Sequence, residues 1–364
     1  MHDATSPVTS SLPSSPAAAA VTVRDTHATQ ADASSSGRSS SGSGTGLSRL
    51  PRAAGSLHRL AVPLIFVGVV AFFGTTTPTF LTAGNLSSLL LNNFALLAIV
   101  ATGMTVAVAA GGIDLSVGTA LDFSSLAFIT LLNAGHGVVV ATFGAIGAGL
   151  VAGGFNAVLI GGLRLTPFLA TLGTLFVGTS VQQLLSGGGL PIYLASGIHI
   201  GLTTAHIAGI ALPLVIVAVV AIVYGAVLAR GRFGRALIAV GEQADVADYS
   251  GLSSRRISGL TYLACALAAA IAGIVLSSTV SAYVPLSGNA FMLNAIGATF
   301  IGTTLSRSAR PNVAGTLVGV LFLNIVANGL LLIGWNFYWQ QVATGLLILV
   351  ILAFSFTSRR ATSR

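Results

Sequence analysis

The chain has 364 residues, of which 54% are hydrophobic and only 7% are charged, and its mean hydropathy is +0.92. A soluble domain carries about a quarter of charged residues, so a soluble fold is excluded for most of the chain. The net charge of +8 comes from arginine alone. Because the arginines are few and scattered, membrane topology explains them better than a nucleic-acid-binding surface does.

The N-terminal segment, residues 1–58, differs in composition from the rest of the chain. It is rich in Ser, Ala, Thr and Gly and contains no Phe, Tyr or Trp. Such a segment cannot bury enough apolar surface to offset its chain entropy, which predicts a disordered cytoplasmic tail. Its longest apolar run, Ala17–Val21, is too short for the hydrophobic region of a secretory signal.

From Leu60 onward, apolar runs alternate with short polar breaks, and most runs reach the roughly 20 residues needed to cross a bilayer. They predict an all-α, polytopic membrane protein with about ten transmembrane helices. The transmembrane domain is expected over residues 59–358, followed by a cytoplasmic tail, 359–364. The predicted spans are 60–74, 87–109, 115–132, 138–160, 166–186, 207–228, 258–281, 290–305, 313–332 and 338–356.

The positions of the arginines favour this number of spans. If the N-terminus is cytoplasmic, the cytoplasmic segments are 1–59, 110–114, 161–165, 229–257, 306–312 and 357–364. Every arginine falls in one of these segments, whereas the opposite segments, 75–86, 133–137, 187–206, 282–289 and 333–337, contain none. This is the positive-inside pattern, and it favours both termini in the cytoplasm.

The polar break between the second and third spans reads Gly111-Gly112-Ile113-Asp114-Leu115-Ser116-Val117-Gly118. A Gly pair weakens a helix by about 2 kcal/mol relative to an Ala pair, and a carboxylate beside it must be shielded from lipid. Both features favour a helix break whose freed backbone groups face protein or a water-filled cavity. The alternative is an ordinary helix end, with Asp114 as the N-cap of the following helix and no role in transport. A break and a cap can be the same piece of structure.

The motifs of several enzyme classes are missing from the sequence. There is no HExxH, CxxC or GxSxG motif and no GxxxxGK[ST] phosphate loop, so ATP hydrolysis is expected on a partner chain and not here. His136, His199 and His206 are too sparse to suggest a metal site, and no cofactor is expected. Cys265 lies in an apolar run and is interpreted as a packing residue. A membrane protein with so few ionisable groups either takes its energy from a partner or conducts passively.

The largest internal polar segment, residues 229–257, reads as a structured loop. A short helix is expected over 236–240, two further helical turns over 242–249, a stop at Gly251 and an N-cap at Ser253. Small side chains on one face of the second short helix suit docking into a groove of a soluble partner. The alternative is an ordinary solvated connector.

Several amide side chains are predicted at membrane depth. They can line a path for a hydroxyl-rich solute, or they can bond helices together for roughly 0.6–2 kcal/mol per contact. For any single amide, helix bonding is favoured. The amides are Asn92, Asn93, Asn156, Gln182, Gln183, Asn294, Asn324, Asn328, Gln340 and Gln341.

The segment Gly111–Gly118 resembles the GGIDLSVG segment of the ribose/xylose/galactose-type permeases of bacterial ABC importers. The resemblance covers roughly residues 60–358, and the eight-residue motif is specific. Further matches follow in the same order along the chain: Gly103-Met104-Thr105, Phe168–Gly173, Arg232-Phe233-Gly234-Arg235, Ala239-Val240-Gly241, Ser250-Gly251-Leu252 and Asn328-Gly329.

The resemblance implies a permease subunit in the bacterial inner membrane that forms the translocation path for a monosaccharide. It implies a two-fold homodimer or heterodimer of permease subunits, ATPase subunits bound to the cytoplasmic loops and an extracytoplasmic solute-binding protein. On this view the translocation core includes Gly111, Gly112, Asp114, Ser116, Gly118 and Asn328. The loop 229–257 would couple to the ATPase through Ala244, Ala247, Ser250 and Gly251.

The sequence departs from the family pattern in two cytoplasmic segments. Where members usually carry Gly-Gly-Thr-Ser and a glycine-rich turn, residues 301–310 read Ile-Gly-Thr-Thr-Leu-Ser-Arg-Ser-Ala-Arg. The pair after Gly241 is Glu242-Gln243 in place of Gly-Asn. These differences keep two alternatives open. One is import of another polar solute, such as an autoinducer, a nucleoside or a sugar alcohol, and the other is a passive channel or membrane scaffold.

Overall fold

The computed structural model describes residues 53–198, 200–202, 204–306 and 310–362. Most of the predicted disordered tail, residues 1–52, lies outside the described residues. The first helix begins at Ala53, so the last six residues assigned to that tail are helical. The last helix continues to Thr362, into the segment expected to be the C-terminal tail.

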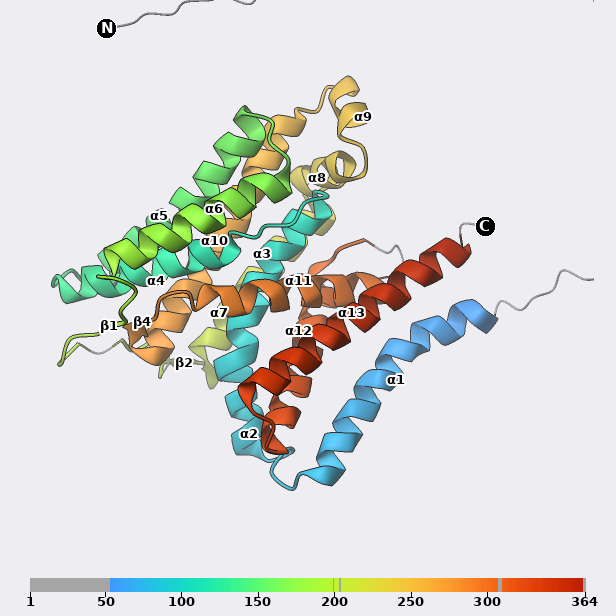
Figure 1. Ribbon diagram of the computed structural model, residues 1–364, viewed down its shortest axis with the longest axis horizontal. Coiled ribbons are helices and arrows are strands. Elements are labelled where there is room, and N and C mark those ends of the chain that lie inside the picture. Colours follow the sequence, from blue (N-terminus) through green and yellow to red (C-terminus); the bar gives the residue numbers. More distant parts are fainter. Residues whose placement is uncertain (1–52, 199, 203, 307–309, 363–364) are drawn as a thin grey trace, which may run out of the picture. The chain divides into compact units, whose positions relative to one another are not determined.

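Helices occupy every range that hydropathy predicts as a span (Figure 1). The second span is composite, since α2 (Ala83–Ser88) continues through a π-helical turn, η1 (Leu89–Phe94), into α3 (Ala95–Ala109). The fourth ends in a second π-helical turn, η2 (Val158–Gly162). The other helices of this set are α1 (Ala53–Thr76), α4 (Val117–Asn133), α5 (Val138–Ala157), α6 (Pro167–Leu185), α7 (Leu212–Arg230), α10 (Ser254–Val280), α11 (Gly288–Leu305), α12 (Val313–Leu332) and α13 (Phe337–Thr362).

The helices differ in whether they are long and apolar enough to cross a membrane. Six helical segments among the described residues meet both conditions: Ala83–Ala109, Val138–Gly162, Pro167–Leu185, Leu212–Arg230, Ser254–Val280 and Val313–Leu332. Three apolar helices are shorter: Leu64–Thr76, Val117–Asn133 and Phe337–Ile351. The described chain is therefore an all-α bundle rich in apolar helices, as composition predicts.

Four two-residue strands interrupt this helical fold, and the sequence analysis does not anticipate them. β1 (Ile192–Tyr193) pairs antiparallel with β4 (Ala282–Tyr283), with Ile192 opposite Tyr283. β2 (His206–Ile207) and β3 (Ile210–Ala211) form a small hairpin. The β1–β4 pair joins two segments that the arginine pattern assigns to the same side of the membrane.

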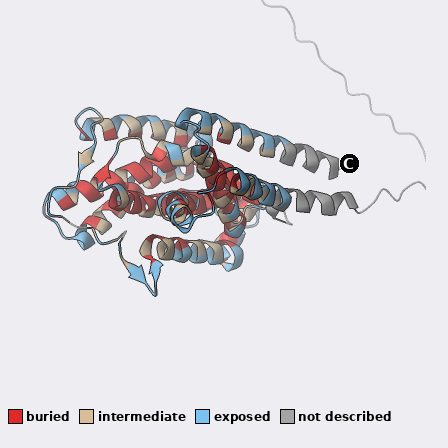
Figure 2. Ribbon diagram, turned by 90° about the horizontal axis from the view of Figure 1, so that it is seen from below, coloured by how far each residue is buried: buried red, intermediate tan, exposed pale blue. Residues whose placement is uncertain are grey.

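The core of the bundle lies around α3 and α10. In the composite second span, 72% of the most apolar 18-residue window is buried, and in α10 the share is 61%. The corresponding share for α7 is only 22%, so α7 lies at the periphery. Figure 2 shows the same division, with buried residues inside the bundle and exposed residues on its outer helices.

Small residues allow α10 to approach its neighbours closely. A Cβ atom on Gly103 of α3 would lie 2.8 Å from the Ala268 Cβ atom, and one on Gly149 of α5 would lie 2.6 Å from the Ala270 Cβ atom. On α10 itself, a Cβ atom on Gly273 would lie 3.0 Å from the Ser124 Cβ atom of α4. Close backbone approach of this kind is the usual basis of helix packing in membranes.

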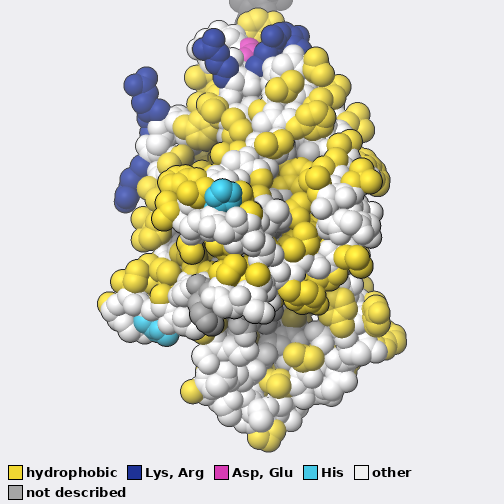
Figure 3. Space-filling model, turned by 90° about the vertical axis from the view of Figure 1, so that its left-hand side faces the viewer, with side chains coloured by type: hydrophobic (Ala, Val, Ile, Leu, Met, Phe, Trp, Pro, Cys, Tyr) yellow, Lys and Arg dark blue, Asp and Glu magenta, His cyan; other side chains and the backbone are white. Residues whose placement is uncertain are grey.

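Three segments that contain arginine meet one another and the break at 110–114 at one end of the bundle. The backbone of Gly111 lies against that of Gly241, and a Cβ atom on Gly161 would lie 2.8 Å from the Arg255 carbonyl oxygen. The guanidinium of Arg310 pairs with the carboxylate of Glu242 at 2.7 Å. These contacts connect segments 110–114, 161–165, 229–257 and 306–312. On the face shown in Figure 3, the arginine side chains lie at the top and along the upper left edge, and none lies in the lowest part.

Segments without arginine meet elsewhere in the bundle. The side chain of Asn133 donates a hydrogen bond to the Tyr193 carbonyl oxygen at 2.9 Å and accepts one from the Ala195 N–H at 2.8 Å. Together with the β1–β4 pair, these bonds connect the end of α4 with segments 187–206 and 282–289. These contacts group three of the segments without arginine with one another.

Two glycines on α5 provide a test of the packing. Gly149→Leu should lower the free energy of unfolding by about 1–3 kcal/mol, because its side chain would overpack the contact with Ala270. Gly147→Leu is the matched control, since Gly147 is exposed and a Cβ atom there meets nothing within 4 Å. The measurement is the thermal unfolding midpoint of the two detergent-solubilised variants. Equal midpoints would contradict the close approach of α5 and α10.

Candidate functional site

The break between α3 and α4 begins with one glycine-dependent turn of the backbone. α3 ends at Ala109, and Gly111 adopts a left-handed conformation with φ of 79°. The Gly112 N–H donates to the Ala107 carbonyl oxygen and the Gly111 N–H donates to the Val108 carbonyl oxygen, each at 3.0 Å. This is a Schellman motif, which satisfies the carbonyl groups at a helix end. The break predicted from the Gly pair is confirmed.

Each glycine of the pair also has a packing reason. A Cβ atom on Gly111 would lie 2.9 Å from the Gly241 carbonyl oxygen, in the loop 229–257. At Gly112, a Cβ atom would collide with the Tyr262 hydroxyl of α10 and lie 3.2 Å from the Pro167 Cβ atom at the start of α6. The pair therefore lets three separate parts of the chain reach one turn.

Asp114 organises the start of α4 from a buried position. Its side chain is 1% exposed, and its Oδ1 atom accepts hydrogen bonds from the Ser116 N–H at 2.9 Å and from the Ser116 hydroxyl at 2.7 Å. Because α4 begins at Val117, the N-cap position belongs to Ser116 and not to Asp114. This corrects the expectation that Asp114 is the N-cap. Asp114 instead fixes the residue that precedes the helix.

A continuous chain of hydrogen bonds extends from Asp114 into α5 and α6. The Asn156 side-chain amide donates to the Ser116 hydroxyl at 2.6 Å, and the Thr174 hydroxyl donates to the Asn156 carbonyl oxygen at 2.5 Å. All four side chains are at most 3% exposed. A buried polar chain is stable only when its members are paired, and here each side chain bonds the next one. Asn156 therefore connects helices, the role favoured for a single amide.

Two residues of α10 lie beside this series of hydrogen-bonded side chains. The Cys265 side chain is a close neighbour of the Asp114 carboxylate, and the Tyr262 hydroxyl lies over Gly112. Within the described residues, that hydroxyl is buried without a hydrogen-bond partner. Cys265 is fully buried in the hydrophobic core, as expected of a packing residue.

The last glycine of the motif, Gly118, has a different neighbour. A Cβ atom on Gly118 would lie 2.7 Å from the Gly288 carbonyl carbon, at the start of α11. Four residues further along α4, the Asp122 Oδ1 atom accepts hydrogen bonds from the Gly288 N–H at 2.9 Å and the Ser287 hydroxyl at 3.0 Å. Gly118 and Asp122 therefore hold the N-terminus of α11 on one face of α4.

Sequence reasoning assigned no role to Asp122. The side chain is fully buried. Asp114 and Asp122 are the two carboxylates of the otherwise uncharged region that contains α4. The available signal was the spacing, since Gly118 and Asp122 are four residues apart and share a helix face. What the spacing could not identify is the partner, which is more than 160 residues away in sequence.

Asn328 does not belong to this site. Its side chain makes two reciprocal hydrogen bonds with Asn85 of α2, at 2.9 and 3.0 Å. Because 26 residues of largely helical chain separate Asn85 from Gly111, this pair lies about 40 Å along the helix from the break. The structure therefore does not bring Asn328 together with the other predicted core residues.

The loop 229–257 contains two short helices, α8 (Arg232–Glu242) and α9 (Ala244–Tyr249), with Gln243 between them. Glu242 therefore ends the first helix, although we expected it to begin the second. Gly251 follows α9 with φ of 83°, as predicted for a helix stop. Ala244, Ser250 and Gly251 are exposed.

Ala247 behaves differently from these three residues. Its side chain is 4% exposed and packs in a cluster with Leu237, Val240 and Ile257. Ala247 thus faces the interior of the chain, which corrects the prediction that it faces a partner. It attaches α9 to the bundle.

The start of α10 is capped from two directions. The Ser253 hydroxyl accepts a hydrogen bond from the Arg256 N–H, which confirms the predicted N-cap. The Asp248 carboxylate of α9 accepts hydrogen bonds from the Ser254 N–H and hydroxyl, each at 2.8 Å. These two bonds lower the pKa of Asp248 below its ordinary value. α9 is therefore tied to the N-terminus of α10.

The two segments that depart from the family pattern meet in the structure. Arg310 Nη2 and Glu242 Oε1 are 2.7 Å apart, and their side chains are 54% and 58% exposed. An exposed ion pair contributes roughly 0–1 kcal/mol, so it orients the segments more than it stabilises the fold. Just before Glu242, the Gly241 backbone packs on the break at Gly111. One short stretch of α8 thus contacts both the break and the segment before α12.

A bundle of apolar helices, with a buried polar break in contact with a structured polar loop, is the architecture of a polytopic membrane protein. The chain belongs to the family described as branched-chain amino acid transport system / permease component, whose model matches residues 86–352. It is therefore a multi-pass transport subunit of the inner membrane and not an enzyme.

Curated relatives match most of the chain. A ribose import permease of Bacillus subtilis (strain 168) is 31% identical over 299 residues, covering 81% of this chain and 92% of the relative. A galactofuranose transporter permease of Escherichia coli (strain K12) is 30% identical, covering 72% and 77%. An L-arabinose ABC transporter permease of Azospirillum brasilense is 29% identical, covering 81% and 87%. No solved structure matches the chain.

Two substitutions of Asp114 separate its structural role from a role of its charge. Asp114→Asn keeps an Oδ1 acceptor for Ser116 and should retain near wild-type thermal stability. Asp114→Ala should lose about 1–3 kcal/mol, because the buried Ser116 donors lose their acceptor. The measurements are the unfolding midpoint and solute uptake of each variant. Normal uptake by Asp114→Asn would restrict Asp114 to organising the break, whereas equal destabilisation by both substitutions would contradict the hydrogen-bond assignment.

Proposed function

We propose that this chain is the permease subunit of an ABC importer for a monosaccharide, driven by ATP hydrolysis on a separate ATPase. The observation that carries this proposal is the set of relatives that match most of the chain, which are named for the transport of ribose, galactofuranose and arabinose. The family description mentions branched-chain amino acids instead, so the solute has to be argued from the residues as well.

The charges of the described residues support a neutral solute. A sugar presents hydroxyl groups and no charge, whereas the carboxylate of an amino acid is stabilised by a cationic partner. Every arginine side chain that the structure describes is exposed: Arg164, Arg230, Arg232, Arg235, Arg255, Arg256 and Arg310. The buried polar side chains are mainly hydroxyls and amides. These are suitable partners for a polyol.

We propose ten transmembrane spans with both termini in the cytoplasm. The domains would be a cytoplasmic tail over 1–58, the permease domain over 59–358 with the loop 229–257, and a short tail over 359–364. Three observations support this arrangement: helices in all of the predicted ranges, arginine on one side only, and contacts that join several of the polar segments assigned to the same side. α9 and the pair Glu242–Arg310 would then face the cytoplasm.

The proposed assembly contains two permease subunits with the solute path at their shared interface, ATPase subunits inside and a solute-binding protein outside. The exposed residues Ala244, Ser250 and Gly251 would contact the ATPase. A movement of α9 would pass to α8, and through the contact of Gly241 with Gly111 it would reach the break between α3 and α4. Such a movement is a two-state switch driven by ligand binding on another chain.

Reconstitution tests the proposed function. Liposomes that contain the permease, its cognate ATPase and the solute-binding protein should accumulate radiolabelled ribose, galactose or arabinose only when ATP is present. Uptake of equal size without the ATPase would identify a passive channel and overturn the proposal. Uptake of a branched-chain amino acid in place of any sugar would support an ATP-driven importer but reject a monosaccharide as its solute.

Substitutions at the end of α9 test the docking surface. Gly251→Trp should uncouple ATP hydrolysis from uptake and lower uptake at least tenfold without preventing membrane insertion, because the bulky side chain would separate α9 from the ATPase. Gly251→Ala is the control, since it introduces the same strain at φ of 83° without the bulk. Ala244→Trp should reproduce the defect at a second exposed position. Normal coupling in both Trp variants would contradict the docking assignment.

A further inference from the structure

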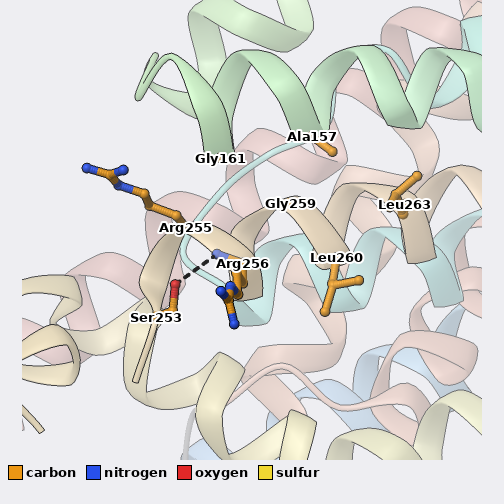
Figure 4. A pocket seen from close by; sticks show the side chains of 8 residues that line it. All are labelled: Ala157, Gly161, Ser253, Arg255, Arg256, Gly259, Leu260 and Leu263. Carbon is orange, nitrogen blue, oxygen red and sulfur yellow. Dashed lines mark hydrogen bonds between the residues drawn. The ribbon is translucent and has the colours of Figure 1, made fainter. Parts of the chain in front are cut away.

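A groove opens between the end of α5 and the start of α10. Its volume is about 640 Å³. Figure 4 shows its lining, with Ala157 and Gly161 on one side and the first turns of α10 on the other. The residues that line it are Ala157, Gly161, Ser253, Arg255, Arg256, Gly259, Leu260 and Leu263.

The groove forms where the glycines Gly161 and Gly259 have no side chain to fill the space, next to the π-helical turn η2. Gly161 lies in η2 and comes so close to α10 that a Cβ atom would lie 2.8 Å from the Arg255 carbonyl oxygen. One turn further along α10, a Cβ atom on Gly259 would lie 3.6 Å from the Ala157 Cβ atom, which is an ordinary contact. The two helices are therefore in ordinary contact at Gly259, which is buried, and approach more closely at Gly161, so the groove lies along the outer side of this contact.

The chemistry of the groove differs between its two ends. Toward the middle of the bundle its lining is apolar, and Leu260 is 52% exposed. Val158 and Leu163 on the same side of α5 and η2 are also exposed, at 61% and 64%, so the apolar end opens onto a surface suited to lipid chains. At the other end, the Arg255 and Arg256 side chains extend away from the helix (Figure 4).

The positive charge at the polar end is only partly compensated among the described residues, because the Asp248 carboxylate is the one acidic group bonded to this turn. Arg255 and Arg256 are exposed, and the ion pair between Arg310 and Glu242 involves neither of them. The nearest acidic neighbour, Asp248, accepts both of its hydrogen bonds from Ser254. Arg164 lies close enough to Asp248 to lower its pKa, which adds a third positive charge near the groove.

We infer that this groove binds one anionic phospholipid of the cytoplasmic leaflet. The phosphate of the headgroup would contact the guanidinium group of Arg255 or Arg256, and an acyl chain would lie along Leu260 and Leu263. Basic pockets between helices on the cytoplasmic side have this character, and guanidinium groups bind phosphate oxygens with directed hydrogen bonds. An apolar groove beside two unpaired cations at the level of the headgroups matches an amphipathic anion better than a soluble one.

Native mass spectrometry of the full-length chain in detergent tests this site. The probe is phosphatidylglycerol, titrated against phosphatidylcholine, and the quantity measured is the dissociation constant of the first bound lipid. The double substitution Arg255→Gln with Arg256→Gln should weaken phosphatidylglycerol binding by roughly fivefold for each arginine removed. The matched control is Arg230→Gln with Arg232→Gln, two exposed arginines that do not line the groove.

A second pair of variants tests the apolar end without changing charge. Gly259→Phe should weaken phosphatidylglycerol binding because its ring fills the groove, whereas Gly259→Ala should have little effect because its Cβ atom meets only an ordinary contact. Unchanged binding in the arginine pair, or equal weakening in the control pair, would overturn the proposal. So would wild-type affinity in a folded Gly259→Phe variant.

Two further outcomes identify other occupants. Binding of inorganic phosphate without any preference for phosphatidylglycerol over phosphatidylcholine would assign the site to a soluble anion. Lipid binding by the monomer that disappears on dimerisation would show that a second copy of the chain covers the groove. Either result would reject the lipid proposal while leaving the transport function untouched.

Discussion

The constraint on which this structure depends is that a helix cannot break within an apolar region unless its freed polar groups find partners in the chain. At the α3–α4 break, the carbonyl groups at the end of α3 are satisfied by the N–H groups of Gly111 and Gly112. The Asp114 carboxylate accepts the N–H and hydroxyl of Ser116 just before α4, and Asn156 and Thr174 extend that pairing to two further helices. The polar chain therefore fixes how α4, α5 and α6 meet.

Small residues allow further segments to pack closely against the break. Gly241 allows α8 to lie directly on the break, and Gly118 allows the start of α11 to reach α4, where Asp122 binds it. The motif Gly111–Gly118 thus has five structural neighbours: the loop 229–257, α5, α6, α10 and α11. A segment with so many backbone contacts tolerates few side chains, which explains its glycines without reference to a solute.

The sequence predicted the parts of this fold that depend on local properties. Helix positions, the break and the Ser253 cap follow from hydropathy, Gly pairs and capping preferences, which act over a few residues. It could not predict the placement of Ala247 inside the bundle, the pairing of Asn328 with Asn85, or the role of Asp122. Each of these depends on a partner far away in sequence, and a side chain alone does not say whether it faces a neighbouring helix or a partner protein.

The ion pair of Glu242 and Arg310 differs physically from the other contacts at its end of the bundle. Because both side chains are more than half exposed, mobile ions screen their attraction, with a Debye length of about 8 Å at physiological ionic strength and less in concentrated salt. The neighbouring contact of Gly241 with Gly111 carries no charge and does not respond to salt. Raising the ionic strength therefore weakens the ion pair that joins α8 to the segment before α12, while the uncharged contact of α8 with the end of α3 persists.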